Sequence, residues 1–420
     1  MAEIIEGSRT SIRGSDYCRS CNSDKLFSAL NLGVLPIANE LSRTPLEQYD
    51  SFELHMKICS DCGLGQVADV VTSSRLFEDY RYLSSTSESF VEHASQYSKN
   101  VIRHLSLGKD DYVLEIASND GYLLTSFVQA GIKVLGIEPA QNVAAVSSLK
   151  GIPTLVGFFG TDLAEKILSN YGCPRLIIAN NVLAHVPDIR DFINGISLLS
   201  GSNTIISIEN PRLRNIIKDN QFDTIYHEHF SYLSCKAVLH LAQEFGLAVF
   251  DVENLETHGG SNRYWLQSKN NDFLVKDSVS KEVQIDISLE LFQSTSWESQ
   301  EIMVQTYLRD FREFLTAQNI SGKKIFGYGA AAKASTLLNA ARVKSGQMVA
   351  IADKSIEKQG RFMPDMNLAI ISPEELTSLG PDILVLFVWN ISSEIMDWIN
   401  NDGPKGVEVW VTIPELKRIL

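Results

Sequence analysis

The chain has 420 residues, of which 44% are hydrophobic and 21% are charged, and a formal net charge of −14. This length exceeds one ordinary hydrophobic core and indicates about three domains. The negative charge argues against a nucleic-acid partner, because phosphate binding needs a basic surface. The longest apolar run, residues 383–389, is too short to span a bilayer, and the first residues lack the apolar core of a signal peptide. We therefore expect a cytoplasmic protein without a membrane partner.

The first motif is a pair of CxxC sequences, Cys18-x-x-Cys21 and Cys59-x-x-Cys62. Each directs two thiolates from one tight turn to a common point, and two such turns complete a tetrahedral four-sulfur site for Zn²⁺. All four ligands then come from the protein, so the zinc is predicted to be structural and the chemistry lies elsewhere. The alternative is a pair of redox-active motifs. The long stretch between the pairs is expected to contain strands of its own.

Further along the chain, short apolar runs alternate with helical segments. This pattern predicts a mostly parallel sheet with helices on both faces. Residues 283–318 are predicted to form one long amphipathic helix, after which a second, smaller α/β unit begins. The expected strands lie at 112–116, 133–139, 175–181, 203–209, 247–253 and 261–268, and in the second unit at 323–329, 348–354, 382–389 and 407–414.

The first glycine loop, Glu115-x-Ala117-Ser118-Asn119-x-Gly121, joins a buried strand to a helix, and Glu138 ends the next strand. An acid at that place binds ribose in dinucleotide and adenosine folds. Glu115 would repel a pyrophosphate but suits the ammonium of a methionine moiety, so S-adenosylmethionine (SAM) is favoured over NAD. An ordinary strand–turn–helix with an acidic turn is the structural alternative. The strand at 175–181 ends in Asn180 and Asn181, where such sheets bind ligands.

The segment Tyr226-His227-Glu228-His229 has three interpretations. An extended conformation would put His227 and His229 on one face as metal ligands. A helix or turn would instead pair Tyr226 with His229, which suits proton transfer and oxyanion stabilisation. A polar loop with a partly buried histidine is the third.

A second glycine loop, which includes Gly329 and Lys333, follows an apolar strand in the last third of the chain, and Asp353 ends the next strand. Backbone N–H groups and a lysine in such a loop favour phosphate, so this part is predicted to bind a nucleotide-like or diphosphate-bearing ligand. His258-Gly259-Gly260-Ser261 resembles a hydrolase oxyanion turn, but the chain has no GxSxG nucleophile motif. We expect that turn to feed the last strand beside the active site.

Taken in order, these motifs resemble the three-domain sugar C-methyltransferases of deoxysugar pathways over nearly the whole chain. Pro364-Asp365 departs from the Pro-Gly usual in that family, and Asn262 replaces a commoner apolar residue. The matching motifs are Cys18-x-x-Cys21 with Leu32-Gly33-x-x-Pro36-x-x-Asn39, Cys59-x-x-Cys62-Gly63, Tyr80-x-Tyr82-x-Ser84, Glu115-x-x-Ser118-Asn119-Asp120-Gly121, Asn180-Asn181-Val182-x-Ala184-His185, Tyr226-His227-Glu228-His229, Thr257-His258-Gly259-Gly260-Ser261 and Gly327-x-Gly329-Ala330-Ala331-x-Lys333.

The resemblance implies an α/β protein with a zinc-binding domain (1–80), a Rossmann-like class I methyltransferase domain (81–310) and a smaller Rossmann-like domain that grips a nucleotide diphosphate (311–420). It implies SAM-dependent methylation at C3′ of a nucleotide-diphosphate-linked 4-keto-deoxysugar. The implied base is His229, and Tyr226, Glu228 and Tyr80 or Tyr82 surround the sugar. The candidates for substrate contact are His185, His258, Gly259, Gly329, Lys333 and Asp353.

Three alternatives stay open on the sequence alone. An O- or N-methyltransferase could use the same scaffold. An NAD-linked sugar oxidoreductase could use the second glycine loop. A non-catalytic zinc-containing protein could hold a nucleotide without turnover.

Overall fold

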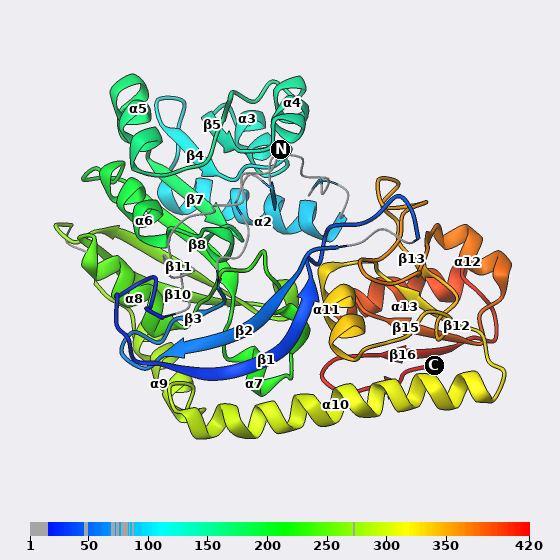
Figure 1. The fold of residues 1–420 in the computed structure, drawn as a ribbon. Helices are drawn as coiled ribbons and strands as arrows, with labels where there is room; N and C mark the ends of the chain where they lie inside the picture. The colour runs from blue at the N-terminus through cyan, green and yellow to red at the C-terminus, as the bar shows by residue number, and fades with distance from the viewer. Residues whose placement is uncertain are drawn as a thin grey trace.

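The computed structural model describes residues 16–45, 49–68, 72, 75–76, 83, 85, 88–271 and 274–420. Within them the strands form three sheets of four, seven and six strands. In Figure 1 the central sheet and its cyan and green helices occupy the left of the view, and the orange and red C-terminal unit occupies the right. The blue N-terminal strands lie next to both. In the part of the chain that is described, no helix combines the length and the apolarity needed to cross a membrane.

The N-terminal sheet is antiparallel and has the order β1-β2-β3-β9. Its strands β1 (Leu26–Pro36) and β2 (Ser51–Cys59) confirm that strands lie between the CxxC pairs, and β3 (Gly65–Gln66) follows the second pair. The fourth strand, β9 (Ser231–Tyr232), comes from much later in the chain. The residues just before β9 are therefore tied to the N-terminal sheet.

The central sheet has the order β10-β11-β8-β7-β4-β5-β6, and only β11 runs antiparallel to its neighbours. The strand order reverses between β4 and β7, and open α/β sheets bind ligands at the carboxyl ends of strands at such a point. All six expected strands form, and β6 is an addition. The strands are β4 (Tyr112–Ile116), β5 (Lys133–Glu138), β6 (Thr154–Val156), β7 (Leu176–Asn180), β8 (Ile205–Pro211), β10 (Leu247–Leu255) and β11 (Ser261–Ser268).

Helices cover both faces of this sheet. Neighbouring residues of a strand point to opposite faces, and here the side chains on both faces are apolar and are buried by helices. Val113 packs with the helices α2 and α3, whereas Leu114 packs with α5, α6 and α8. Both residues are fully buried. The helices of this part are α2 (Glu88–Leu105), α3 (Leu124–Gln129), α4 (Gln141–Leu149), α5 (Thr161–Tyr171), α6 (Ile189–Leu198), α7 (Asn215–Lys218) and α8 (Cys235–Glu244), with 3₁₀ turns η2 (Leu183–His185), η3 (Phe222–Thr224) and η4 (Thr257–Gly259).

The C-terminal sheet has the order β14-β13-β12-β15-β16-β17 and is parallel except for β17. Its order also reverses around β12, so a second ligand-binding edge is expected at the ends of β12 and β15. This confirms the second α/β unit. Its elements are β12 (Ile325–Tyr328), α11 (Ala332–Ala340), β13 (Ile351–Ala352), β14 (Ile370–Ile371), α12 (Pro373–Leu379), β15 (Ile383–Leu386), η5 (Trp389–Ile391), α13 (Ser392–Asn401), β16 (Glu408–Val411) and β17 (Lys417–Arg418).

The prediction of one helix over residues 283–318 is wrong. The structure has α9 (Asp277–Ser288) and α10 (Ser294–Ile320), with Glu290 between them at a left-handed φ of 50°. The break turns Leu291 into the core, where its carbonyl accepts a hydrogen bond of 2.9 Å from the Trp297 indole. Helix α10 then packs against β1 of the N-terminal sheet and β12 of the C-terminal sheet, and it runs along the bottom of the view in Figure 1. The expected domain boundary at 310/311 falls inside α10, and the division stays a prediction.

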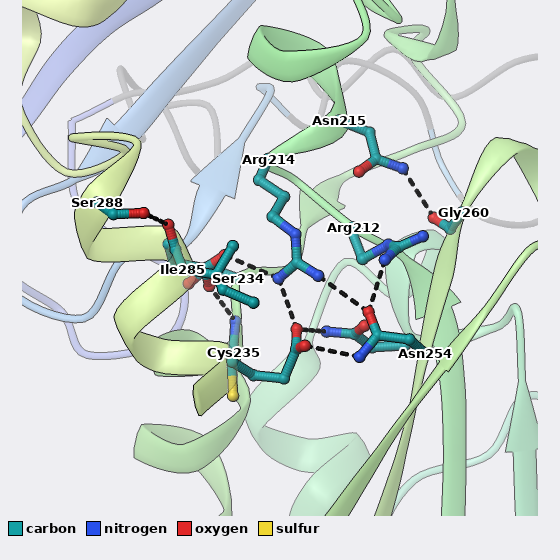
Figure 2. Close-up of polar contacts among 12 residues, drawn as sticks. Arg212, Arg214, Asn215, Ser234, Cys235, Asn254, Gly260, Ile285 and Ser288 are labelled. Carbon is teal, nitrogen blue, oxygen red and sulfur yellow. Dashed lines mark hydrogen bonds and ion pairs between the residues drawn. The ribbon is translucent and has the colours of Figure 1, made fainter. Parts of the chain in front are cut away.

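A buried ionic network ties α9 to strand β10 and to the turn that follows β8. The Arg214 guanidinium donates to Glu282 Oε2 at 2.5 Å, to Asp286 Oδ1 at 3.2 Å and to Asn254 Oδ1 at 3.1 Å. Figure 2 shows Arg214 directed at Asn254. Asn262 Nδ2 also donates to Glu282, at 3.1 Å, so this departure from the resembled family takes part in the network.

The same region supports the turn around His258. Asn215 Nδ2 donates to the carbonyls of Gly259 and Gly260 at 2.9 and 3.1 Å, and Figure 2 shows Asn215 pointing at Gly260. Removing one partner of a buried ion pair leaves an uncompensated charge. Loss of one partner of this network should therefore cost more than loss of one partner of a surface pair.

We expect Arg214→Met to lower the free energy of unfolding by about 3–5 kcal/mol, because Glu282 and Asp286 would stay buried without their cation. The matched control is Arg309→Met, which removes an exposed arginine paired with Asp310 and should cost about 0.5 kcal/mol or less. Urea unfolding monitored by circular dichroism measures both. Equal midpoints for the two variants would contradict the assignment.

Candidate active site

A cavity of about 1010 Å³ opens at the carboxyl ends of β4, β5 and β7. Its wall contains residues from all three parts of the chain. Asn39 comes from the N-terminal unit, and Lys333 and Lys358 come from the C-terminal unit. From the candidate residues, the central part contributes Glu115, Ala117, Asn119, Glu138, Asn180, Asn181, His185, Tyr226, Glu228, His229 and His258.

The loop after β4 is fixed by unusual backbone conformations. Ala117, Asn119 and Gly121 have left-handed φ values of 58°, 51° and 75°. Such a φ is uncommon for a residue with a side chain and clusters at functional sites. The turn lets the Asn119 amide donate to Glu138 at 3.0 Å, and the Ala140 amide at the start of α4 donates to the same carboxylate at 3.0 Å, so Glu138 is held at the cavity wall.

Glu115 lies deeper and is only 2% exposed. Burial, and then the charges of Glu138 and Asp120, raise its pKa well above the usual value. Its Oε2 atom has no hydrogen-bond partner among the described residues. Since buried polar groups are normally paired, this arrangement suits a cationic group of a ligand.

Four other candidates contribute in two different ways. Ser118 and Gly121 do not line the cavity. The Ser118 amide donates to Ile137 O at 2.9 Å, and a Cβ at Gly121 would come within 2.4 Å of Ile152, so both shape the turn. Asn180 and Asn181 do line the cavity, and the side-chain oxygen of each lacks a hydrogen-bond partner in the described structure.

The segment at residues 226–229 forms a turn, in which the His229 amide donates to Tyr226 O at 2.9 Å. The turn brings the Tyr226 hydroxyl to 2.7 Å from His229 Nε2. At the other side of the ring, His229 Nδ1 lies 3.0 Å from Thr224 O. A carbonyl only accepts, so Nδ1 carries the hydrogen and Nε2 keeps its lone pair. Burial, and then the nearby His185, hold the pKa of His229 well below its usual value.

Two neighbours complete this wall of the cavity. Glu228 Oε1 accepts hydrogen bonds from the amide and the side chain of Asn39, at 3.1 and 3.0 Å, and burial raises the pKa of Glu228 to about 7. His185 Nδ1 donates to Glu228 O at 2.7 Å, and its ring meets that of His229 edge to face at 4.6 Å. Asn39 was in a motif but was not among the predicted site residues.

His227 faces away from the cavity. Its Nε2 atom lies 3.2 Å from Phe52 O in the N-terminal sheet. The two histidines of the segment therefore do not share one ligand position, and the turned conformation holds instead of the extended one. Tyr80 and Tyr82, the other two candidates for catalysis, lie outside the described residues.

The turn at residues 257–260 places His258 on the cavity wall with a left-handed φ of 56°. Gly259 does not line the cavity and packs on the Trp389 ring, where a Cβ would come within 2.3 Å of the indole. Burial lowers the pKa of His258 to about 4, so its imidazole is neutral near pH 7.

In the C-terminal unit, Lys333 lies in the first turn of α11 and burial lowers its pKa to about 8. Gly329 and Asp353 do not line the cavity. Gly329 has a φ of 93° and packs against Val388, and Asp353 accepts from Ser355 N at 2.9 Å and from Lys358 at 3.4 Å. Lys358, which sequence reasoning missed, reaches the cavity in place of Asp353. At Pro364-Asp365, Asp365 takes a left-handed φ of 54°, a conformation that glycine adopts freely.

The four cysteines converge away from the cavity. Their sulfur atoms all lie within 4.8 Å of one another, with 3.5 Å between Cys18 and Cys62 and between Cys21 and Cys59. Tetrahedral Zn–S bonds of about 2.3 Å need sulfurs about 3.8 Å apart, so this set fits zinc. All four ligand positions are filled by protein, which gives a structural site.

Family models match three consecutive parts of the chain. A model described as "Putative zinc binding domain" matches residues 18–77, a "Methyltransferase domain" matches 90–252, and a "C-methyltransferase C-terminal domain" matches 256–414. The C-methyltransferase NovU of Streptomyces niveus is 31% identical over 410 residues, which cover 97% of this chain and 98% of NovU. The chain belongs to the C-methyltransferase family.

Solved structures with local likeness include the magnesium protoporphyrin IX methyltransferase of Synechocystis PCC 6803 with bound SAM, at 15% identity and a TM-score of 0.33, over 46% of this chain and 89% of that one. Another is the PH0226 protein of Pyrococcus horikoshii OT3, at 12% identity and a TM-score of 0.36, over 47% and 98%. The family makes this protein a SAM-dependent C-methyltransferase with a zinc-binding domain, and its predicted cofactors are thereby confirmed.

We expect this C-methyltransferase to hold about one zinc ion per chain, and Cys59→Ser to release it and lower the thermal midpoint, because a structural zinc supplies folding free energy. The control is Cys173→Ser, which replaces an exposed thiol. Elemental analysis and thermal unfolding measure the two effects. Wild-type protein that contains no zinc after purification without chelator would contradict the site.

We expect Glu138→Ala to weaken SAM binding by about 2–3 kcal/mol, the size typical of a hydrogen bond to a charged acceptor. Calorimetric titration with SAM measures this change. Glu165→Ala, on the exposed face of α5, is the control and should leave SAM affinity unchanged. If the two variants bind SAM equally well, the ribose assignment is wrong.

Proposed function

We propose that this C-methyltransferase methylates C3′ of a nucleotide-diphosphate-linked 4-keto-deoxysugar. One observation carries the proposal: the acidic first loop, the Tyr226–His229 pair and Lys333 line a single cavity. A ketone-bearing sugar at the pair would have a diphosphate within the reach of the C-terminal unit. The three-domain division at residues 80/81 and 310/311 belongs to the same proposal.

In this proposal Glu115 and Glu138 hold the cofactor. Glu138 accepts hydrogen bonds from the ribose hydroxyls, and the buried carboxylate of Glu115 faces the methionine ammonium. Bound SAM supplies the electrophilic methyl group that a carbanion can take. Asn180 and Asn181 provide amide groups at the end of β7, next to β4 at the reversal of the strand order.

His229 is the base in this proposal. A C–H next to a ketone is acidic because its electron pair can move onto the carbonyl oxygen. His229 Nε2 accepts the C3 proton, the C3–H pair forms the C3–C4 double bond of an enolate, and the C4 oxygen becomes negative. The lowered pKa of His229 means that the imidazole is neutral at pH 7, so its Nε2 atom carries no proton before the reaction.

The Tyr226 hydroxyl is placed to stabilise the enolate. It donates to His229 Nε2 in the absence of a substrate, so it must turn to the ketone oxygen before the Nε2 lone pair can take up the C3 proton. A donor aimed at a developing oxyanion is worth several kcal/mol, about 3 in measured cases. Glu228, held by Asn39, and His185 surround the pair and orient the sugar.

The proposal predicts that proton removal can be seen without methyl transfer. With S-adenosylhomocysteine bound, the wild-type enzyme should exchange C3 hydrogen of a ketosugar for deuterium from D₂O. A panel of TDP-, GDP- and CDP-linked 4-keto-deoxysugars supplies the probes, and NMR reads the exchange. His229→Asn should lower the exchange and the methylation by about 100-fold or more, because a positioned base contributes at least that factor.

His227→Asn is the matched control. It removes a hydrogen bond to Phe52 O and lowers stability, but the folded variant should keep its exchange rate. Exchange that persists in His229→Asn and disappears in His227→Asn would transfer the role to the neighbour. A product with its methyl group on oxygen or nitrogen would contradict the proposed function.

A further inference from the structure

Trp389 makes three separate contacts, and two of them join the C-terminal unit to the central part. It follows β15, at the carboxyl edge where the order of the C-terminal sheet reverses. The indole Nε1–H donates to Asp223 Oδ2 at 2.8 Å. The ring carries the Lys333 ammonium at 4.1 Å from its centroid, and its far edge packs against Gly259, where a Cβ would clash.

The contact with Lys333 fixes a flexible side chain. A lysine has a long stem with several rotatable bonds, and binding has to pay for ordering it. Here the ammonium lies on the indole face and donates to Asn390 Oδ1, the next residue, at 2.9 Å. One short segment after β15 therefore holds the ammonium at the cavity wall before a ligand arrives.

The contact with Asp223 reaches the base. Asp223 is fully buried in η3, and Thr224, which follows it, supplies the carbonyl that accepts from His229 Nδ1 at 3.0 Å. Thr336 of α11 donates to the next carbonyl, that of Ile225, at 3.0 Å. The C-terminal unit thus holds the backbone that fixes the tautomer of His229.

We propose that Trp389 is a positioning residue that sets both the Lys333 ammonium and, through Asp223 and Thr224, the orientation of His229. The inference rests on the proposed function for the role of His229, whereas the Lys333 part needs only an anionic ligand. The Trp389 indole then couples the binding of the diphosphate by Lys333 to the orientation of the His229 imidazole.

Two variants separate the two tasks. Trp389→Phe keeps an aromatic face for Lys333 but loses the N–H donor, so pyrophosphate affinity should stay within about twofold while the C3 exchange rate falls about tenfold. Trp389→Leu loses both, so pyrophosphate affinity should also fall by about three- to tenfold. Lys333→Met should weaken pyrophosphate alone. SAM affinity should not change in any of them.

A double variant tests whether Trp389 acts through Lys333. If it does, Trp389→Leu added to Lys333→Met should cause no further loss of pyrophosphate affinity, because the shared interaction is already gone. The control is Trp410→Phe on β16, whose indole packs on Phe314 instead. Calorimetry measures pyrophosphate and SAM binding, and NMR measures exchange with TDP-4-keto-6-deoxyglucose.

Trp389 variants that match Trp410→Phe in both readouts would overturn the inference, and so would additive losses in the double variant. A parallel loss of SAM affinity would show a general structural role and would overturn it too. A wild-type enzyme that binds pyrophosphate but exchanges no C3 hydrogen with any probe contradicts the proposed function. The pyrophosphate series then still decides whether Trp389 positions Lys333.

Discussion

One segment, residues 222–232, is held from both sides, and the arrangement of the site depends on it. On the N-terminal side, β9 pairs with β3 and the Asn39 side chain fixes Glu228. On the C-terminal side, Trp389 and Thr336 hold Asp223 and Ile225. The turn at residues 226–229 does not fix its own orientation, because a short loop has few backbone hydrogen bonds of its own. The three-part architecture supplies that rigidity.

Burial sets the electrostatics of the cavity wall. It lowers the pKa of the histidines and raises that of the carboxyl groups, since both neutral forms are favoured where water is excluded. Glu228, with a pKa of about 7, and His229, with a lowered pKa, can therefore sit side by side without a strong charge. Around His229 the wall is therefore a set of neutral donors and acceptors, and in the proposed function these respond when an enolate charge develops.

The sequence was sufficient for features that depend on local pattern. The paired CxxC turns, the acid at the end of β5 and the alternation of strands and helices follow from spacing and periodicity, and the structure has them. It was insufficient for contacts between distant segments. Asn39 and Glu228 are 189 positions apart, and Trp389 and Asp223 are 166 apart, so no local period links them. The prediction of one continuous helix across Glu290 was wrong for a similar reason, because the burial of Leu291 and Trp297 overrides a continuous helical period.

The second glycine loop shows how a nucleotide-binding pattern can be read too literally. Its strand–loop–helix geometry forms as expected. The carboxylate of Asp353, at the place of a ribose-binding acid, instead accepts a hydrogen bond from the Ser355 amide and pairs with Lys358. What reaches the cavity is positive: Lys333 on its indole and Lys358 beside Ala330 O at 2.9 Å. This end of the C-terminal sheet therefore presents two cations, while its candidate ribose-binding acid, Asp353, is already paired. Such a site suits phosphate groups better than ribose hydroxyls. The two α/β sheets thus face one cavity with opposite charge, acidic at the cofactor loop and basic at the C-terminal loop. In the proposed function this polarity orders an ammonium-bearing and a phosphate-bearing ligand along the cavity.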